Sequence, residues 1–178
     1  IRGEHIQRYK LNLSSDNSDR RWFNFETFEK EMSEKKLAIT ISNMKQKRIV
    51  MQNIANLSLK NRLIASICPP NCIVGHSAEF LIPRNINIYC MLGIINSKLL
   101  NWRFKITSSN NHVNIYELEL LPFPHSIDPG LEKKISQLTK IILDKSGKNQ
   151  NYEMEESNLN NLIFKIYGIT EEEKKFID

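Results

Sequence analysis

The sequence contains few cysteines and no long apolar run. Cys68, Cys72 and Cys90 are an odd number of thiols at unremarkable spacing, which argues against a disulfide framework and favours a reducing compartment. No apolar stretch approaches the roughly 20 residues that a membrane-spanning helix needs. We therefore expect a soluble, cytoplasmic protein without a membrane partner.

A zinc site is the alternative interpretation of the cysteines, because Cys68, Cys72 and His76 lie near one another along the chain. Structural zinc sites use four ligands at recognisable spacings, and the intervening Pro69-Pro70 indicates a turn. We favour free thiols that are buried or half-buried. No metal site is predicted.

Motifs for catalysis are also missing. The six glycines are scattered singly, so the chain has no Gly-rich phosphate loop and no dinucleotide fingerprint, and it has neither a His-Glu-x-x-His pair nor a Gly-x-Ser-x-Gly turn. The four histidines are isolated, which favours surface or structural roles. The sequence predicts no catalytic residue and no cofactor of its own.

The charge of the chain and its distribution give the first indication of a partner. There are 25 basic and 20 acidic residues, a formal net charge of +5. Acidic residues gather in the segment 26–34 and in the last third, whereas the middle, from Lys35 to Lys105, is strongly basic. This balance favours a polyanionic partner without requiring one. Because the chain begins with Ile1 and no leader precedes its fold, we expect it to be part of a longer protein.

The first half contains several short apolar patterns. Polar and apolar residues partly alternate over Ile6–Leu13, and do so more clearly over Lys36–Ile41 and Arg48–Ile54, which predicts short strands. Further strands are expected at 62–68 and 78–82. Between the first two strands, Phe25 to Lys35 has the spacing of a short amphipathic helix.

The second half changes to helical spacing. Apolar residues recur every three or four positions from Ile88 to Ile106, which predicts one helix with a stripe that faces the core. The polar stretch Thr107–Val113 should be an exposed loop before a short strand around Ile115. Leu121-Pro122-Phe123-Pro124 predicts an extended segment that ends the globular part.

The last fifty residues predict a helical tail. Asp128 as N-cap and Pro129 at the first helical position start a helix that continues to Gly147. A second helix closes at Gly168, and Thr170–Glu173 forms a capping box for a final turn. The first of these helices has one apolar seam, made of Leu131, Ile135, Leu138 and Ile142. This seam can pack against the rest of the chain, a neighbouring module or a second copy.

Five segments, in order, resemble the landmarks of one enzyme family. The first, Ile1-Arg2-Gly3-Glu4-His5-Ile6-Gln7-Arg8-Tyr9, is similar to Leu-Arg-Gly-x-Asp-Ile-x-Arg-Tyr, with His5 where the pattern has Asp. The others are Arg48-Ile49-Val50 through Arg62-Leu63-Ile64-Ala65, Tyr89-x-x-Leu92-Gly93-x-Ile95-Asn96-Ser97-Lys98-Leu99, Leu121-Pro122-Phe123-Pro124, and Ile166-Tyr167-Gly168-Ile169-Thr170-Glu171-Glu172-Glu173. The chain thus resembles the specificity domain that follows the adenine-methyltransferase module in Taq I-like and Eco57I-like type II restriction-modification enzymes.

The resemblance implies a fold and a function. The patterns above predict a mixed α/β (α+β) fold, with a strand-rich module with inserted helices over residues 1–125 and a helical tail over 126–178, and the resemblance identifies the first part as a target-recognition domain. The function is sequence-specific recognition of double-stranded DNA, in a chain whose other modules methylate or cleave it. Those modules would use S-adenosylmethionine and Mg²⁺, and the family's Asn-Pro-Pro-Tyr motif is absent here. No cofactor is expected in this part.

DNA affinity comes mainly from cations on phosphates, and specificity from donors and acceptors that reach base edges. We predict the phosphate contacts to be Arg8, Arg20, Arg21, Lys45, Lys47, Lys98 and Lys105. We predict the base contacts to be Gln46, Arg48, Gln52, Asn53, His76, Ser77, Asn110, Asn111 and His112.

Other roles remain open for several of these residues. The cations can be ordinary solvated surface, and Asn110 and Asn111 can simply cap a helix or form a turn. Arg62 is expected to be structural, and Trp102 to belong to the core. The alternative function is a protein-interaction module that assembles a larger complex through its helical tail.

Overall fold

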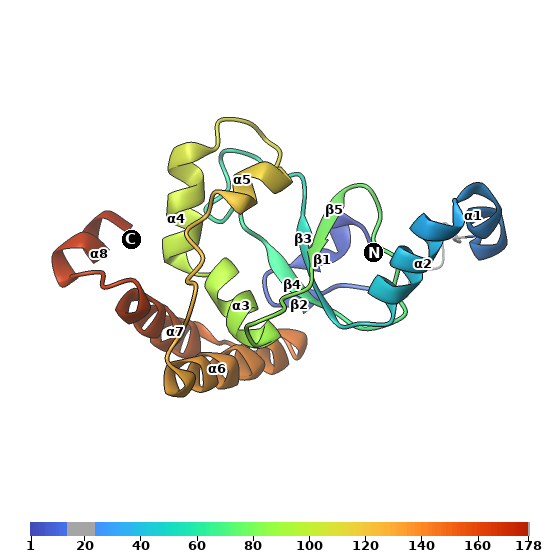
Figure 1. Ribbon diagram of the computed structural model, residues 1–178. Coiled ribbons are helices and arrows are strands. Elements are labelled where there is room, and N and C mark those ends of the chain that lie inside the picture. Colours follow the sequence, from blue (N-terminus) through green and yellow to red (C-terminus); the bar gives the residue numbers. More distant parts are fainter. Residues whose placement is uncertain (14–23, 178) are drawn as a thin grey trace.

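The fold combines eight α-helices with two small antiparallel sheets over the residues that the computed structural model describes, 1–13 and 24–177 (Figure 1). A short hairpin pairs β1 (Ile6–Gln7) with β2 (Lys10–Leu11). The mixed α/β class with a helical C-terminal region is therefore confirmed. None of the helices in the described ranges is long and apolar enough to cross a membrane.

The larger sheet has β3 (Arg48–Gln52) at its centre, between β4 (Ala65–Cys68) and β5 (Ala78–Leu81). Ile49 faces Ile67 on one side and Leu81 on the other. The first four residues of β3 are all buried, as is typical of a central strand. These three strands confirm the expected ones, with shorter bounds.

The segment Lys36–Ile41 is not a strand. It lies inside α2 (Glu34–Met44), which follows α1 (Phe25–Glu31). In this helix Leu37, Ile41 and Met44 are half-buried at helical spacing, whereas Ile39 is exposed. The apparent alternation was too short to separate the two periods. The predicted helix at α1 is confirmed, and both helices lie to the right of the sheet in Figure 1 without any buried residue.

The single helix predicted from Ile88 to Ile106 is two helices, α3 (Ile88–Ile95) and α4 (Lys98–Thr107). Ser97 caps α4, since its hydroxyl accepts from the Leu100 N–H at 3.2 Å. Side chains of Asn and Ser offer the backbone alternatives to helical hydrogen bonds, which explains a break inside a continuous apolar stripe.

The loop after α4 is confirmed, but the strand predicted around Ile115 is wrong. Residues 115–119 form the short helix α5 (Ile115–Glu119). The Asn114 N–H donates to the Glu117 carboxylate at 3.0 Å in a capping box. This capping box stabilises a single helical turn, and a segment of five residues is too short for apolar periodicity to reveal a helix.

The tail contains the predicted helices. Asp128 accepts a hydrogen bond from the Leu131 N–H at 3.0 Å at the start of α6 (Pro129–Gly147). After α7 (Glu153–Ile166), Gly168 adopts φ +65°, and the Thr170–Glu173 capping box precedes α8 (Glu171–Ile177).

The seam of α6 packs against the chain's own α3. Ile135 and Ile142 have no exposed surface and share one hydrophobic cluster with Ile49, Leu92 and Leu159. Within the single chain, the seam is therefore covered by the chain's own core. The division between residues 125 and 126 stays a prediction.

Gly93 allows α3 and α6 to lie this close. A Cβ atom at this position would stand 2.5 Å from Thr139 Oγ1 and 3.3 Å from Ile135 Cγ2. At Gly147, the last residue of α6, nothing lies within 4 Å of the same added atom.

We expect Gly93→Ala to lower the free energy of unfolding by about 1–2 kcal/mol, because overpacking outweighs the gain in helix propensity. Gly147→Ala is the matched control and should leave stability unchanged or slightly raised. Urea denaturation followed by circular dichroism measures both. Equal stability of the two variants would contradict the close approach of α3 and α6.

Candidate nucleic-acid interface

Three segments predicted to contact bases meet at the C-terminal end of β3. The Asn53 N–H donates to the Ser77 carbonyl at 3.1 Å, and the Val113 N–H donates to the Asn53 carbonyl at 2.7 Å. The Ala55 N–H donates to the Asn111 carbonyl at 2.8 Å. We call this surface the recognition edge; it consists of Gln52, Asn53, His76, Ser77, Asn110, Asn111 and His112.

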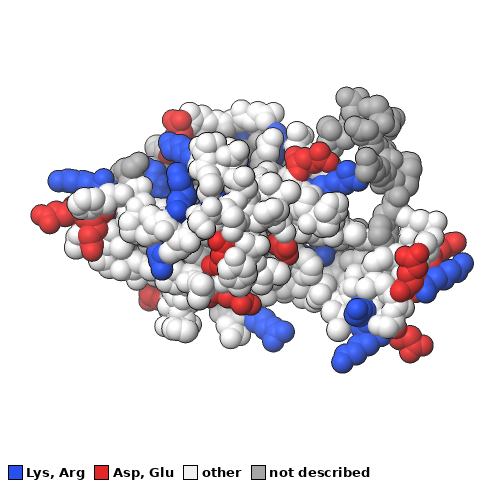
Figure 2. Space-filling view, turned by 90° about the horizontal axis from the view of Figure 1, so that it is seen from above, with Lys and Arg blue, Asp and Glu red and all other residues white. Residues whose placement is uncertain are grey.

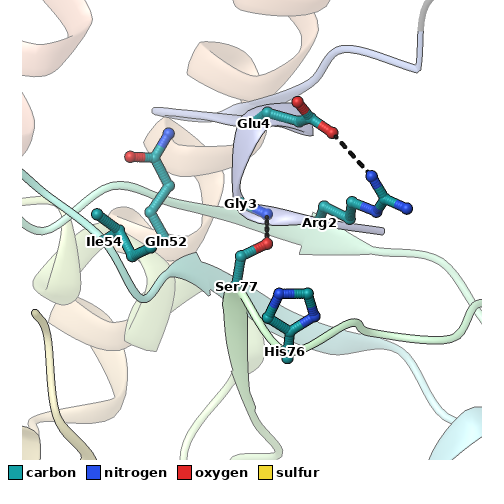
Figure 3. A pocket seen from close by; sticks show the side chains of 7 residues that line it. All are labelled: Arg2, Gly3, Glu4, Gln52, Ile54, His76 and Ser77. Atoms are coloured by element: carbon teal, nitrogen blue, oxygen red, sulfur yellow. Dashed lines mark hydrogen bonds and ion pairs between the residues drawn. The ribbon is translucent and has the colours of Figure 1, made fainter. Parts of the chain in front are cut away.

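A pocket of about 480 Å³ opens beside this edge, between the end of β3, the turn before β5 and the N-terminal 3₁₀ turn Gly3–His5 (Figure 3). Gln52 and His76 lie on either side of Ser77 in this view, and the Gly3 N–H donates to Ser77 Oγ at 3.0 Å. A Cβ on Gly3 would stand 2.5 Å from the Ser77 carbonyl oxygen, so only glycine fits there. The pocket therefore presents polar groups from a fixed backbone.

Arg2 and Glu4 also line the pocket and were missed by the sequence prediction. Their side chains approach each other at 3.6 Å and are partly exposed. Both belong to the first segment of the family resemblance. Their position in a motif was the available signal, but only the fold shows that this segment lies against the turn at Ser77.

Arg62 joins two loops from inside. It is 1% exposed and donates to the Ala55 carbonyl at 3.3 Å, the Ser108 carbonyl at 3.2 Å and the Asn110 carbonyl. Its guanidinium also lies 4.9 Å from the centre of the Phe104 ring. Burial lowers the pKa of Arg62, and the charge of Glu117 partly opposes this. The expected structural role is confirmed.

The loop held by Arg62 forms a turn of its own. Asn110 Oδ1 accepts from the His112 N–H at 2.7 Å, and Asn111 Oδ1 accepts from the Leu57 N–H at 3.0 Å. The turn-forming alternative thus holds for Asn110, whereas the Asn111 carboxamide oxygen joins this loop to the segment at Leu57. The amide NH₂ groups remain on exposed residues without a partner in the described part of the chain, and His112 Nδ1 lies 3.3 Å from Asn53 Oδ1. Donors and acceptors are therefore available at the surface.

Arg48 was predicted to contact bases, but the structure contradicts this prediction. It is 2% exposed, its guanidinium donates to the Cys72 carbonyl, and it lies 5.1 Å from the centre of the Phe80 ring. A side chain that reads bases has to reach the surface. Arg48 therefore supports the sheet and the turn around Cys72.

Arg8 is half-buried and makes an ion pair. Its Nη2 lies 2.5 Å from Glu156 Oε1 and donates to the Asn96 carbonyl at 2.6 Å, and its side chain is 17% exposed. This ion pair ties the β1–β2 hairpin to α7. The geometry argues against a phosphate contact by Arg8, because its charge is already paired.

The other predicted cations lie on separate parts of the surface. Lys45, Gln46 and Lys47 are exposed at the N-terminal end of β3, where Lys47 Nζ donates to the Tyr89 hydroxyl at 2.9 Å. Lys98 and Lys105 are exposed on α4. Basic and acidic side chains are interspersed on the face shown in Figure 2. Arg20 and Arg21 lie outside the described residues.

The thiols occupy structural positions. Cys68 and Cys90 are buried and Cys72 is half-buried, as expected. Burial raises the pKa of Cys68 to about 11, so the thiolate is scarce at neutral pH. Within residues 1–13 and 24–177, no three His, Cys, Asp or Glu side chains are grouped so that they could hold a metal ion.

Replacing Arg62 tests its role as the support of the recognition edge. We expect Arg62→Met to reduce the free energy of unfolding by about 3 kcal/mol, because three buried carbonyls lose their donor. Amide hydrogen exchange should accelerate first in residues 108–113. Arg84→Met, at an exposed position, is the control, and an equally small effect of both changes would refute this role.

Comparison with known families agrees with this geometry. The profile of the family described as "TaqI-like C-terminal specificity domain" matches residues 1–123. A search of curated proteins found no match to the chain. The match covers the sheet, the recognition edge and helices α1 to α5. The chain therefore belongs to the TaqI-like C-terminal specificity domain family, which has a DNA-recognition role in restriction-modification enzymes.

Proposed function

We propose that this chain recognises a specific sequence in double-stranded DNA through the recognition edge. The observation that carries the proposal is the convergence of three polar segments, 52–53, 76–77 and 110–112, which backbone hydrogen bonds join at one end of β3. These segments are up to 60 residues apart in the sequence. Their meeting at the surface of a DNA-recognition family member supports a common role.

The chemistry of the edge suits base edges in the major groove. A carboxamide presents both a donor and an acceptor, and an imidazole nitrogen does either, so such side chains distinguish bases by hydrogen bonding. We assign base contacts first to His76, Asn111 and His112, which are exposed. Gln52 is half-buried, with its Nε2 donating to the Ile6 carbonyl at 2.7 Å, and its oxygen is the atom assigned to DNA.

Phosphate contacts would position the duplex on this edge. Lys45, Lys47, Lys98 and Lys105 keep this assignment because they are exposed. Phosphate contacts carry little sequence information, so they provide affinity that decreases with salt. Replacing the lysines should therefore lower the affinity for any duplex, whereas replacing residues of the recognition edge should lower the sequence preference.

The larger enzyme is also part of the proposal. We infer a type II restriction-modification polypeptide in which an adenine methyltransferase module acts on the DNA that this domain positions. S-adenosylmethionine and Mg²⁺ would bind to the methyltransferase and nuclease modules. An adenine inside a duplex has to be flipped out before methylation, so a domain that holds the flanking bases assists this step. The cytoplasm is the location that we propose for such an enzyme.

The alternative is assembly of a larger complex through the helical tail, and it would have to use a surface other than the apolar seam of α6. The seam of α6 is covered by α3 of the same chain. The seam is therefore not available to a partner in this fold.

Selection from a pool of randomised duplexes tests sequence recognition. The wild-type chain should enrich a motif, and a fluorescently labelled duplex with that motif should bind at least tenfold more tightly than a scrambled one. His76→Ala combined with His112→Ala should remove most of this preference, since a good base contact contributes about 1–3 kcal/mol of discrimination.

His125→Ala is the matched control, because His125 is exposed but lies outside the recognition edge. Its selected motif should equal that of the wild type. Enrichment of no motif by the wild type, or an unchanged motif in the double variant, would refute the assignment of the recognition edge.

A further inference from the structure

A second cavity of about 470 Å³ lies between α4, α8 and the segment before β4. We call it the α4–α8 groove; the residues that matter for its chemistry are Lys60, Lys98, Trp102, Lys105 and Phe176. Figure 1 shows α8 beside the lower part of α4, at the left of the molecule. The family match ends at residue 123, so α8 adds one wall from outside the matched region.

The groove has a pronounced chemical bias. Three lysines line it and no carboxylate of a described residue does. Lys60 and Lys105 are exposed, and Lys105 Nζ points to the Lys60 carbonyl at 3.5 Å. Trp102 is half-buried and packs against the core, as expected from its place in the apolar stripe. The groove thus combines apolar side chains with exposed lysines.

Hydrogen bonds connect this groove to the recognition edge. Asn101 Nδ2 donates to the Lys60 carbonyl at 3.0 Å, and Asn101 Oδ1 accepts from the Arg62 N–H at 2.7 Å. Arg62 in turn holds the loop that includes Asn110. The groove and the recognition edge are therefore joined by a chain of hydrogen bonds through Asn101 and Arg62.

The reach between the two sites is short. Ile54 lines the pocket beside the recognition edge, and Lys60 lines the groove. Six residues span at most about 20 Å even when fully extended. The major groove is about 12 Å wide, with a phosphate backbone on each side. The separation of the two sites is therefore within the dimensions of one short stretch of duplex.

We propose that the α4–α8 groove binds the phosphate backbone of the duplex whose bases the recognition edge reads. This inference rests on the proposed function and assigns Lys60, which the sequence did not single out, as a phosphate contact with Lys105. Trp102 lies next to the backbone and reports its binding. The site supplies affinity and register and carries no sequence preference.

Neutralisation of the two lysines tests the groove. Lys60→Gln with Lys105→Gln should raise the Kd for the motif and for a scrambled duplex by a similar factor, about tenfold or more at 0.1 M salt. The slope of log Kd against log salt should fall by about 0.9 for each lost contact. Fluorescence anisotropy at several salt concentrations measures both quantities. The selected motif should not change.

Lys133→Gln with Lys134→Gln is the matched control, since it removes the same charge from exposed positions on α6. It should alter the Kd by less than threefold. A Trp22→Phe variant leaves Trp102 as the sole tryptophan, and its emission should change on addition of duplex. Adding polyglutamate of the same charge should leave that emission unchanged.

The outcomes separate the two proposals. If the wild type binds the motif and both lysine pairs have the same effect, the groove is refuted and the recognition edge stands. If polyglutamate alone changes the Trp102 emission, the groove takes an acidic polypeptide and the DNA assignment is wrong. If the wild type binds no duplex at all, the proposed function and this inference both fail.

Discussion

The buried guanidinium of Arg62 is the interaction on which the candidate DNA-binding surface depends. A cation removed from water is costly unless its donors are satisfied. Here three backbone carbonyls and the face of Phe104 surround it. Because the carbonyls belong to two loops, the same bonds hold residue 55 against residues 108 and 110. The charge can therefore be buried only when the two loops are ordered around it.

Two carboxamides extend this order to the helices. Asn96 accepts from the Ala65 N–H at 3.0 Å and donates to the Ala65 carbonyl at 2.9 Å, so its side chain pairs with β4 as a neighbouring strand would. Asn101 makes similar bonds to the Lys60 carbonyl and the Arg62 N–H. The break between α3 and α4 therefore serves to join the helices to the sheet. This gives a physical reason for the Asn96-Ser97 pair within one of the family segments.

Local patterns in the sequence were sufficient for much of the fold. Caps such as Asp128 and Gly168, and the alternation around β3, depend on neighbours along the chain. The helix at Lys36–Ile41 and the break at Asn96 were missed, because short apolar patterns are ambiguous and because the partner of Asn96 is 31 residues away. Burial of Arg48 was missed for the same reason, since the Cys72 carbonyl that its guanidinium binds is 24 residues away in the sequence. The polar segments of the site could be identified by residue type, but their convergence required the fold.

Base recognition is assigned to one end of β3, and the helices behind it support this site. Amide chemical shifts of the ¹⁵N-labelled chain, recorded while a duplex is added, test this assignment most directly and without any substitution. We expect the largest changes at residues 52–55, 76–77 and 110–112, with α6 nearly unaffected. Shifts concentrated on α6 and α7, with none at those three segments, would contradict the account.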